Sequence, residues 1–207
     1  MAITYQAGRR IQATSTDFAG IPAVVGGWKE VGRTTLGTAG DTISVASLAD
    51  KRYYMTLVNT GASGTVTNFY QFNGDTGSNY AHRNSYDGGA DSTAVNTTQY
   101  DIGLGLGTTP EFTVSYIANL SAKEKLIQTH KVRQNTAGAG TAPKRGEFVG
   151  KWANTSSAFN RIDAINNQSG DYPIGSEVVV LGWDPTDTHT SNFWEELADI
   201  SLTSTNT

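Results

Sequence analysis

Short stretches in which apolar and polar residues alternate recur along the chain between Trp28 and Trp183. A period of two residues places successive side chains on opposite faces of a strand, so each stretch predicts a β-strand with one face toward a core. Clusters of Gly, Asn, Asp and Ser separate the stretches and are typical of turns. The predicted strands cover residues 42–45, 53–58, 66–72, 112–117, 126–132, 147–152, 161–165 and 177–181.

These strands number about eight, which is the number that a jelly-roll β-sandwich requires. The composition agrees, because 81 of the 207 residues are Gly, Thr, Ser or Asn and only 16% are charged, a mixture that disfavours helices. The Asn73-Gly74 and Asp87-Gly88-Gly89 segments supply residues that adopt the positive φ angles of tight turns. We therefore predict an all-β protein in which residues 28–183 form a jelly-roll β-sandwich of antiparallel strands.

Two arms flank the predicted sandwich. Residues 1–27 show weak alternation, and we interpret them either as a disordered terminus or as an extended arm that orders on a neighbouring subunit. Residues 184–207 form the second arm. Candidate assembly contacts in the two arms are Arg9, Arg10, Phe18, Phe193, Trp194 and Leu197.

The C-terminal arm contains a segment that resembles the start of the sandwich. Residues 194–202 align without a gap on residues 28–36, the opening strand, with identical Trp, Glu and Leu at the first, third and ninth positions. The arm therefore resembles the first strand of a second copy of the domain. A short amphipathic helix is the alternative, because Asn192 can cap it and the apolar residues have helical spacing.

Charge and cysteine content exclude several classes of function. The formal net charge is −4 and the basic residues are scattered, so we expect no nucleic-acid partner. No apolar run approaches the roughly 18 residues of a membrane span, and the first residues lack the apolar segment of a signal peptide. We therefore expect a soluble chain with no membrane partner. The absence of cysteine rules out disulfides and thiolate metal sites.

No catalytic motif is present in the sequence. The three histidines, His82, His130 and His189, lack the short spacings of a zinc site, and no Gly-x-Ser-x-Gly motif marks a nucleophile. The glycine run at 103–107 lacks the Lys-Ser or Lys-Thr pair and the following helix of a phosphate-binding loop. We therefore expect a protein that is not an enzyme and that has no cofactor.

The Gly-rich region 73–91, which we expect to be a loop, gathers most of the candidate ligand-binding groups. Its aromatic rings suit the face of a pyranose and its polar groups suit sugar hydroxyls, so a carbohydrate- or host-receptor-binding module is the alternative function. Its oxygen ligands also suit calcium, but no twelve-residue calcium loop is present. We expect no bound metal, with calcium as the alternative. The candidates are Asn73, Asp75, Tyr80, His82, Arg83, Tyr86, Asp87 and Asp91.

Short sequence segments in a fixed order resemble those of a known protein family, and the resemblance covers most of the chain from Trp28 onward. They are residues 28–37, 40–43, 51–55, 72–80, 87–91, 148–152 and 175–185. In this order they resemble structural proteins of tailed phages, especially those of marine and environmental viruses. The resemblance implies a jelly roll on the outside of a capsid or in a tail appendage, often in tandem copies.

The resemblance therefore implies a non-enzymatic virion structural protein, a surface subunit that decorates or cements the capsid or forms part of a tail or fibre appendage. We expect a homo-oligomer, with a trimer favoured, because arms can pair with the edge strands of a neighbouring subunit. Other virion proteins, such as the major capsid protein, and host-surface glycans are the further partners expected. This chain departs from tandem members in having one complete copy, which argues against a long multi-domain fibre.

Overall fold

The computed structural model describes residues 28–61, 64–103, 109–120 and 122–184. All regular elements in this part of the chain are strands, which confirms the all-β class, and no helix there is long and apolar enough to span a membrane. The twelve strands are β1 (Lys29–Thr35), β2 (Thr42–Val45), β3 (Tyr53–Thr60), β4 (Asn68–Phe72), β5 (Tyr80–Tyr86), β6 (Ser92–Thr97), β7 (Tyr100–Asp101), β8 (Glu111–Ala118), β9 (Lys125–Arg133), β10 (Lys144–Trp152), β11 (Ile162–Asn166) and β12 (Glu177–Trp183).

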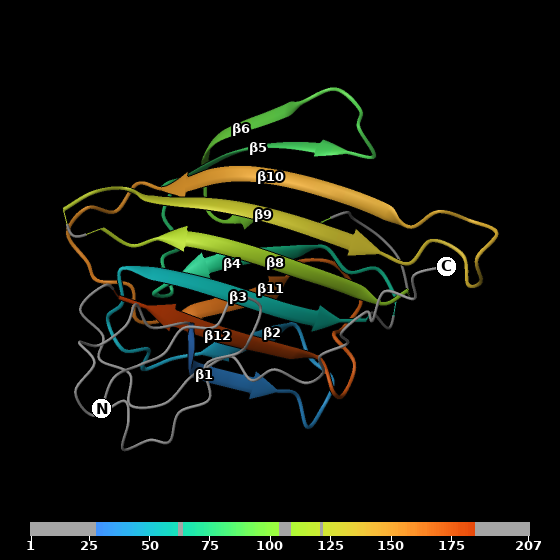
Figure 1. Ribbon diagram of the computed structural model, residues 1–207, viewed down its shortest axis with the longest axis horizontal. Helices are drawn as coiled ribbons and strands as arrows, with labels where there is room; N and C mark the ends of the chain where they lie inside the picture. The colour runs from blue at the N-terminus through green and yellow to red at the C-terminus, as the bar shows by residue number, and fades with distance from the viewer. Residues whose placement is uncertain (1–27, 62–63, 104–108, 121, 185–207) are drawn as a thin grey trace, which may run out of the picture. The chain divides into compact units, whose positions relative to one another are not determined.

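The strands form two antiparallel sheets. The larger sheet has the order β1-β12-β3-β8-β9-β10-β5-β6, and the smaller sheet has the order β2-β11-β4-β7. Along the chain, β1 to β4 alternate between the two sheets, and β7, β8, β11 and β12 do so as well. Two four-stranded sheets connected in this way, β1-β12-β3-β8 and β2-β11-β4-β7, form a jelly roll. Figure 1 shows the smaller sheet behind the larger one.

Four further strands enlarge this jelly roll. The β5–β6 pair follows β4 in the sequence, and the β9–β10 pair follows β8. Both pairs join the larger sheet beyond β8, so the larger sheet has eight strands and the smaller sheet has four. In Figure 1 the added strands lie along the upper side of the sheet. The two pairs are therefore additions to a sandwich that is already complete.

Each predicted strand is present, and β1 coincides with the opening strand expected at 28–36. The sequence pattern does not predict β5, β6 or β7, and the expectation of a loop over 73–91 is wrong for Tyr80–Tyr86. This segment pairs with β10 along its whole length, from Tyr80 opposite Trp152 to Tyr86 opposite Gly146. Its residues do not alternate between apolar and polar types, so its extended conformation depends on a partner far along the chain.

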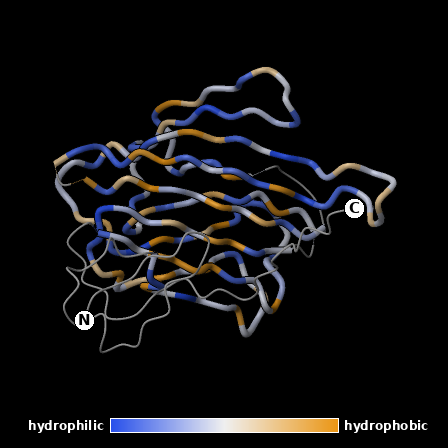
Figure 2. The backbone as a smooth tube through the Cα atoms, viewed as in Figure 1, coloured by the Kyte–Doolittle hydropathy of each residue, from blue (hydrophilic) through white to orange (hydrophobic). Residues whose placement is uncertain are grey.

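An aromatic cluster fills the space between the sheets. Trp152 from β10 and Phe72 from β4 have ring centroids 5.9 Å apart, and Phe72 lies 5.0 Å from Phe159. All three side chains are fully buried. Gly150 lets the Tyr100 ring from β7 approach β10, because a Cβ at this position would collide with that ring. Figure 2 shows apolar and polar residues alternating along the strands that enclose this core.

Candidate functional site

The predicted ligand-binding residue Asn73 supports the turn between β4 and β5. Its side-chain oxygen accepts hydrogen bonds from the N–H groups of Asn160 and Arg161 at 2.9 and 3.1 Å. Its amide donates to the Ala158 carbonyl at 2.7 Å. Asn73 and Gly74 have positive φ angles, as the turn sequence predicts. Both polar atoms of the Asn73 side chain are thus used within the fold.

Asp75 anchors the aromatic core. Its carboxylate accepts a hydrogen bond from Trp152 Nε1 at 2.7 Å. The amide of Asn79 and the N–H of Gly77 donate to the same carboxylate at 2.9 and 2.8 Å. Burial raises the pKa of Asp75, but these hydrogen bonds outweigh it and leave the pKa lowered. The Tyr80 hydroxyl donates to the Asp75 carbonyl at 2.9 Å, so this candidate also has a structural partner.

The remaining candidates lie along β5 and beyond its end. Arg83 and Asp91 form an exposed ion pair at 3.2 Å. Asp87 has a positive φ angle and accepts a hydrogen bond from the Arg145 N–H at 2.9 Å. The Tyr86 hydroxyl donates to a backbone carbonyl in the loop after β7. These contacts connect β5 to its neighbours.

The predicted candidates do not converge on one ligand. His82, in the middle of β5, packs edge-to-face on Tyr100 with ring centroids 6.1 Å apart. The seven residues of β5 span about 20 Å, so the groups at its two ends lie far apart. Within the described residues, no group of three or more His, Asp or Glu side chains is arranged to hold a metal ion.

Several predicted features lie outside the described residues. They include His189, most of the 184–207 arm with its aligned segment 194–202, and most of the 103–107 glycine run. All six candidate assembly contacts also lie there, namely Arg9, Arg10, Phe18, Phe193, Trp194 and Leu197.

Strand β9 carries charged side chains on its buried side, whereas its exposed side has no Asp, Glu, Lys or Arg and consists of Leu126, Gln128, His130 and Val132. Lys125, Lys131 and Arg133 are at most 7% exposed. In contrast, Leu126 is 58% exposed and Val132 is 41% exposed. An amphipathic strand at the surface of a sandwich normally has the reverse arrangement. The exposed side of β9 thus has the composition of a contact surface.

The same character extends over the outer face, the side of the larger sheet that points away from the smaller sheet. On the neighbouring strands β3, β8 and β9, no outward position is Asp, Glu, Lys or Arg. Phe112 on β8 lies directly opposite Val132 on β9. Five apolar side chains of the outer face are between 41% and 58% exposed: Phe112, Tyr116, Leu126, Val132 and Val149.

Behind the outer face, buried charged and polar groups contact one another. Lys131 Nζ lies 2.5 Å from the Glu111 carboxylate, which also accepts a hydrogen bond from the Asn68 amide at 2.6 Å. Burial lowers the pKa of Lys131, although the charge of Glu111 opposes this. Burial also raises the pKa of Asp101, which accepts a hydrogen bond from the Gly103 N–H at 2.7 Å. We assign these enclosed groups a structural role.

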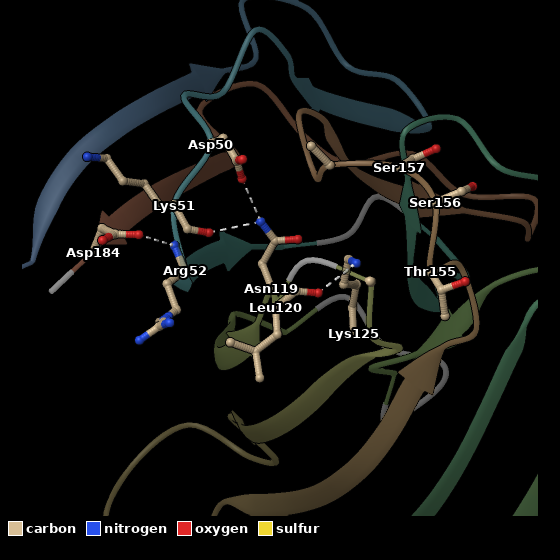
Figure 3. A pocket seen from close by; sticks show the side chains of 12 residues that line it. Asp50, Lys51, Arg52, Asn119, Leu120, Lys125, Thr155, Ser156, Ser157 and Asp184 are labelled. Atoms are coloured by element: carbon tan, nitrogen blue, oxygen red, sulfur yellow. Dashed lines mark hydrogen bonds between the residues drawn. The ribbon is translucent and has the colours of Figure 1, made fainter. Parts of the chain in front are cut away.

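A polar cleft of about 240 Å³ lies at the end of the sandwich where β3 and β9 begin and where β8 and β12 end. We call it the end cleft (Figure 3). The Asn119 amide donates to the Asp50 carboxylate at 3.0 Å and to the Lys51 carbonyl at 2.9 Å. Lys125 Nζ donates to the Leu120 carbonyl at 3.2 Å. These bonds fix the walls of the cleft.

An aromatic groove of about 370 Å³ opens on the outer face at the same end of the sheet. The rings of Tyr53 and Trp183 are stacked, with centroids 5.2 Å apart and an interplanar angle of 17°. The ring centroid of Trp28 lies 6.4 Å from the ring centroids of both Trp183 and Tyr116. Leu126 also lines the groove. Trp183 Nε1 is buried and has no hydrogen-bond partner among the described residues.

Sequence reasoning did not identify either hollow, because their walls come from segments that are distant in the chain. The sequence held one indication of the groove. Residues 51–55 and 175–185, two of the segments that carry the family resemblance, contribute Tyr53 and Trp183 to it. No protein-family model, no curated protein and no solved structure was found to match the chain.

Proposed function

We propose that this protein is a non-enzymatic structural subunit of a phage particle, which decorates or cements the capsid or forms part of a tail or fibre appendage. The assignment to a phage rests on the resemblance of the sequence phrases. The assignment to an assembly subunit rests on one observation, the apolar outer side of β9 and its neighbours. The chain assembles by burying this surface against a neighbouring subunit.

The partner on the outer face is a second copy of the same chain. The outward positions of the strands at the centre of the face carry no Asp, Glu, Lys or Arg, and the flanking strands carry opposite charges in pairs. On one flank, the Arg33 guanidinium on β1 lies 3.2 Å from the Glu177 carboxylate on β12. On the other flank, the Arg145 guanidinium lies 3.7 Å from the Glu147 carboxylate, both on β10. Two copies therefore meet without repulsion between like charges. A closed homo-oligomer satisfies this arrangement; in the trimer that we favour, the outer face of one copy meets a different surface of the next, because only a twofold dimer pairs a face with itself.

The apolar side chains alone do not hold such an assembly together. Full burial of a side chain of this size stabilises by roughly 1.5–3 kcal/mol, so covering the exposed half of five contributes on the order of 5 kcal/mol. Association costs roughly 4–15 kcal/mol. Further contacts are needed, and the edge strands β1 and β6 of the larger sheet offer unpaired backbone groups for them. We expect segments of residues 1–27 and 185–207, which lie outside the described residues, to supply these contacts.

The experiment compares the full chain with a chain that lacks residues 1–27 and 185–207. We expect the full chain to form a discrete oligomer in sedimentation and to join particles when they assemble, and the shortened chain to do neither. The proposal fails if the full chain is monomeric at high concentration and the shortened chain joins particles as efficiently. Circular dichroism of the shortened chain controls for its folding.

A further inference from the structure

One carboxylate oxygen inside the sandwich contacts the side-chain nitrogens of both a lysine and an asparagine. Glu111 Oε2 on β8 lies 2.5 Å from Lys131 Nζ on β9. The same oxygen accepts a hydrogen bond of 2.6 Å from Asn68 Nδ2 on β4. The lysine belongs to the larger sheet and the asparagine to the smaller sheet. A single acid therefore holds an amine of one sheet close to an amide of the other.

This group of three side chains is enclosed by the fold. Lys131 lies directly opposite Thr113 on β8, and Glu111, two residues before Thr113, is on the same face of that strand. The Lys131 side chain is completely buried and that of Glu111 is 10% exposed. Asn68 is 2% exposed. Water therefore has little access to the amide carbon, and the amine is the nucleophile held beside it.

A role in packing alone leaves two atoms of this group unexplained. An ammonium group has three N–H donors, but Lys131 Nζ has no hydrogen-bond partner beyond Glu111 among the described residues. Asn68 Oδ1 is also buried without a hydrogen-bond partner there. Buried polar atoms of this kind are uncommon and require an explanation. They are the nucleophile, and the oxygen on which negative charge develops, if the amine attacks the amide.

The surroundings prepare Lys131 for this attack. Burial lowers the pKa of Lys131, although the charge of Glu111 opposes this. A lysine amine is nucleophilic only after it has lost its proton, and a buried lysine loses the proton more readily. Glu111 is the base in contact with that proton. Transfer of the proton to Glu111 replaces two buried charges by two neutral groups, which the interior tolerates better.

We propose that Lys131 and Asn68 form an isopeptide bond that joins the two sheets, with Glu111 as the general acid and base. The Lys131 amine attacks the Asn68 side-chain carbon, so that a bond forms between Nζ and Cγ and the bond between Cγ and Nδ2 breaks. Two of the three ammonium protons pass in turn through Glu111 and leave with the Asn68 nitrogen as an ammonium ion, while the third stays on the new amide. The Glu111 carboxylate is regenerated, and no oxidant or other co-reactant is needed.

The bond ties β4 to β9 in a chain that contains no cysteine and so forms no disulfide. A covalent link between residues that are distant in the sequence stabilises a fold mainly by restricting the unfolded chain. The reaction takes place once in each chain, so it is compatible with a non-enzymatic subunit. It concerns a single chain and does not depend on assembly through the outer face.

The test measures the mass of the folded, purified full chain by mass spectrometry after denaturation. Loss of ammonia should lower the mass by about 17 Da relative to the sequence. Fragmentation of proteolytic peptides should then find residues 68 and 131 in one branched peptide. The full sequence mass after prolonged incubation of the folded chain would overturn the proposal. So would the same loss at another place, such as ring closure at Asn73-Gly74, which also releases ammonia, or a link from Lys131 to Asn84.

Variants test the role of each group. Asn68→Ala and Lys131→Arg should keep the full sequence mass, and Glu111→Gln, which cannot accept the proton, should form the bond at least about tenfold more slowly. Lys125→Met is the matched control, because Lys125 is equally buried but its Nζ contacts backbone carbonyls, and this variant should still lose ammonia. Bond formation at the normal rate in Glu111→Gln would refute the role of Glu111.

Circular dichroism establishes which variants are folded, and the mass of the unaltered chain decides the proposal even if a variant does not fold. The Asn68→Ala variant has a second use. It keeps the contact between Lys131 and Glu111 but cannot form the bond, so it is the reference in which the energy of that ion pair is measured.

Discussion

Lys131 on β9 and Glu111 on β8 form an ion pair inside the sandwich, with Lys131 Nζ 2.5 Å from the carboxylate. The Lys131 side chain is completely buried and that of Glu111 is 10% exposed. Side chains alternate between the two faces of a strand, so a strand that directs its charges inward directs the residues between them outward. The ion pair and the apolar outer face are therefore two consequences of one orientation of β9.

Removing one member of this pair should destabilise the fold strongly. Lys131→Met leaves the Glu111 carboxylate buried without its cation, and we expect the free energy of unfolding to fall by about 3–5 kcal/mol in urea titrations. Lys131→Met combined with Glu111→Leu should recover most of this loss, because no unpaired charge remains. As a control, Arg83→Ala breaks an exposed pair and should cost less than about 1 kcal/mol. Equal losses in Lys131→Met and Arg83→Ala would contradict the buried position of the pair.

Adding a methyl group at Gly150 should disturb the contact between the sheets. A Cβ there would meet the Tyr100 ring and lie 2.6 Å from the Ala81 carbonyl oxygen. We expect Gly150→Ala to lower the free energy of unfolding by about 1–3 kcal/mol, measured by thermal denaturation. No atom lies within 4 Å of the corresponding position at Gly140, so Gly140→Ala is the matched control. If both variants melt at the same temperature, Tyr100 does not pack against β10.

His82 should make stability depend on pH. Burial lowers the pKa of His82, although the charge of Asp101 opposes this. The unfolded chain therefore binds a proton more readily, and the stability present above the unfolded pKa of about 6.5 is lost as pH falls through the folded pKa. We expect the free energy of unfolding to decrease between about pH 7 and pH 5.

The His82→Gln variant tests this effect; the raised pKa of Asp101 acts in the opposite direction, and because the charge of His82 lowers the pKa of Asp101, the comparison reports the two groups together. The difference in unfolding free energy between the unaltered protein and His82→Gln should change over this pH range. A constant difference for His82→Gln from pH 7 to pH 5 would refute the assignment.

Most of the jelly roll could be predicted from the sequence because strand formation leaves a local signal. Alternation and turn residues locate β2, β3, β8 and β12 within a few residues. They do not locate β5, whose sequence Tyr-Ala-His-Arg-Asn-Ser-Tyr has no apolar period and which is held by β10. Nor do they give the orientation of β9, because Leu126 and Ile127 are adjacent apolar residues that point to opposite sides.

The candidate site was less predictable than the fold. The 73–91 region has the right residue types, but a strand separates them, and the side chains of Asn73 and Asp75 are hydrogen-bonded within the fold. The end cleft is assembled from three connections, β2–β3, β8–β9 and β10–β11, and from the residue after β12. Juxtapositions of this kind follow from sheet topology, which no single segment encodes.

The central claim, that the outer face is covered by a second copy, can be tested by the reaction of a single introduced thiol. The chain contains no cysteine, so Val132→Cys on the outer face and Ile174→Cys, an exposed loop position away from the strands, each provide one reactive site. The measurement is the rate of maleimide labelling as a function of protein concentration.

We predict that Val132→Cys is labelled much more slowly than Ile174→Cys at concentrations where the oligomer forms, and that the two rates converge on dilution to the monomer. Equal rates at every concentration, with an oligomer present, would contradict the claim that copies of the chain meet through the outer face.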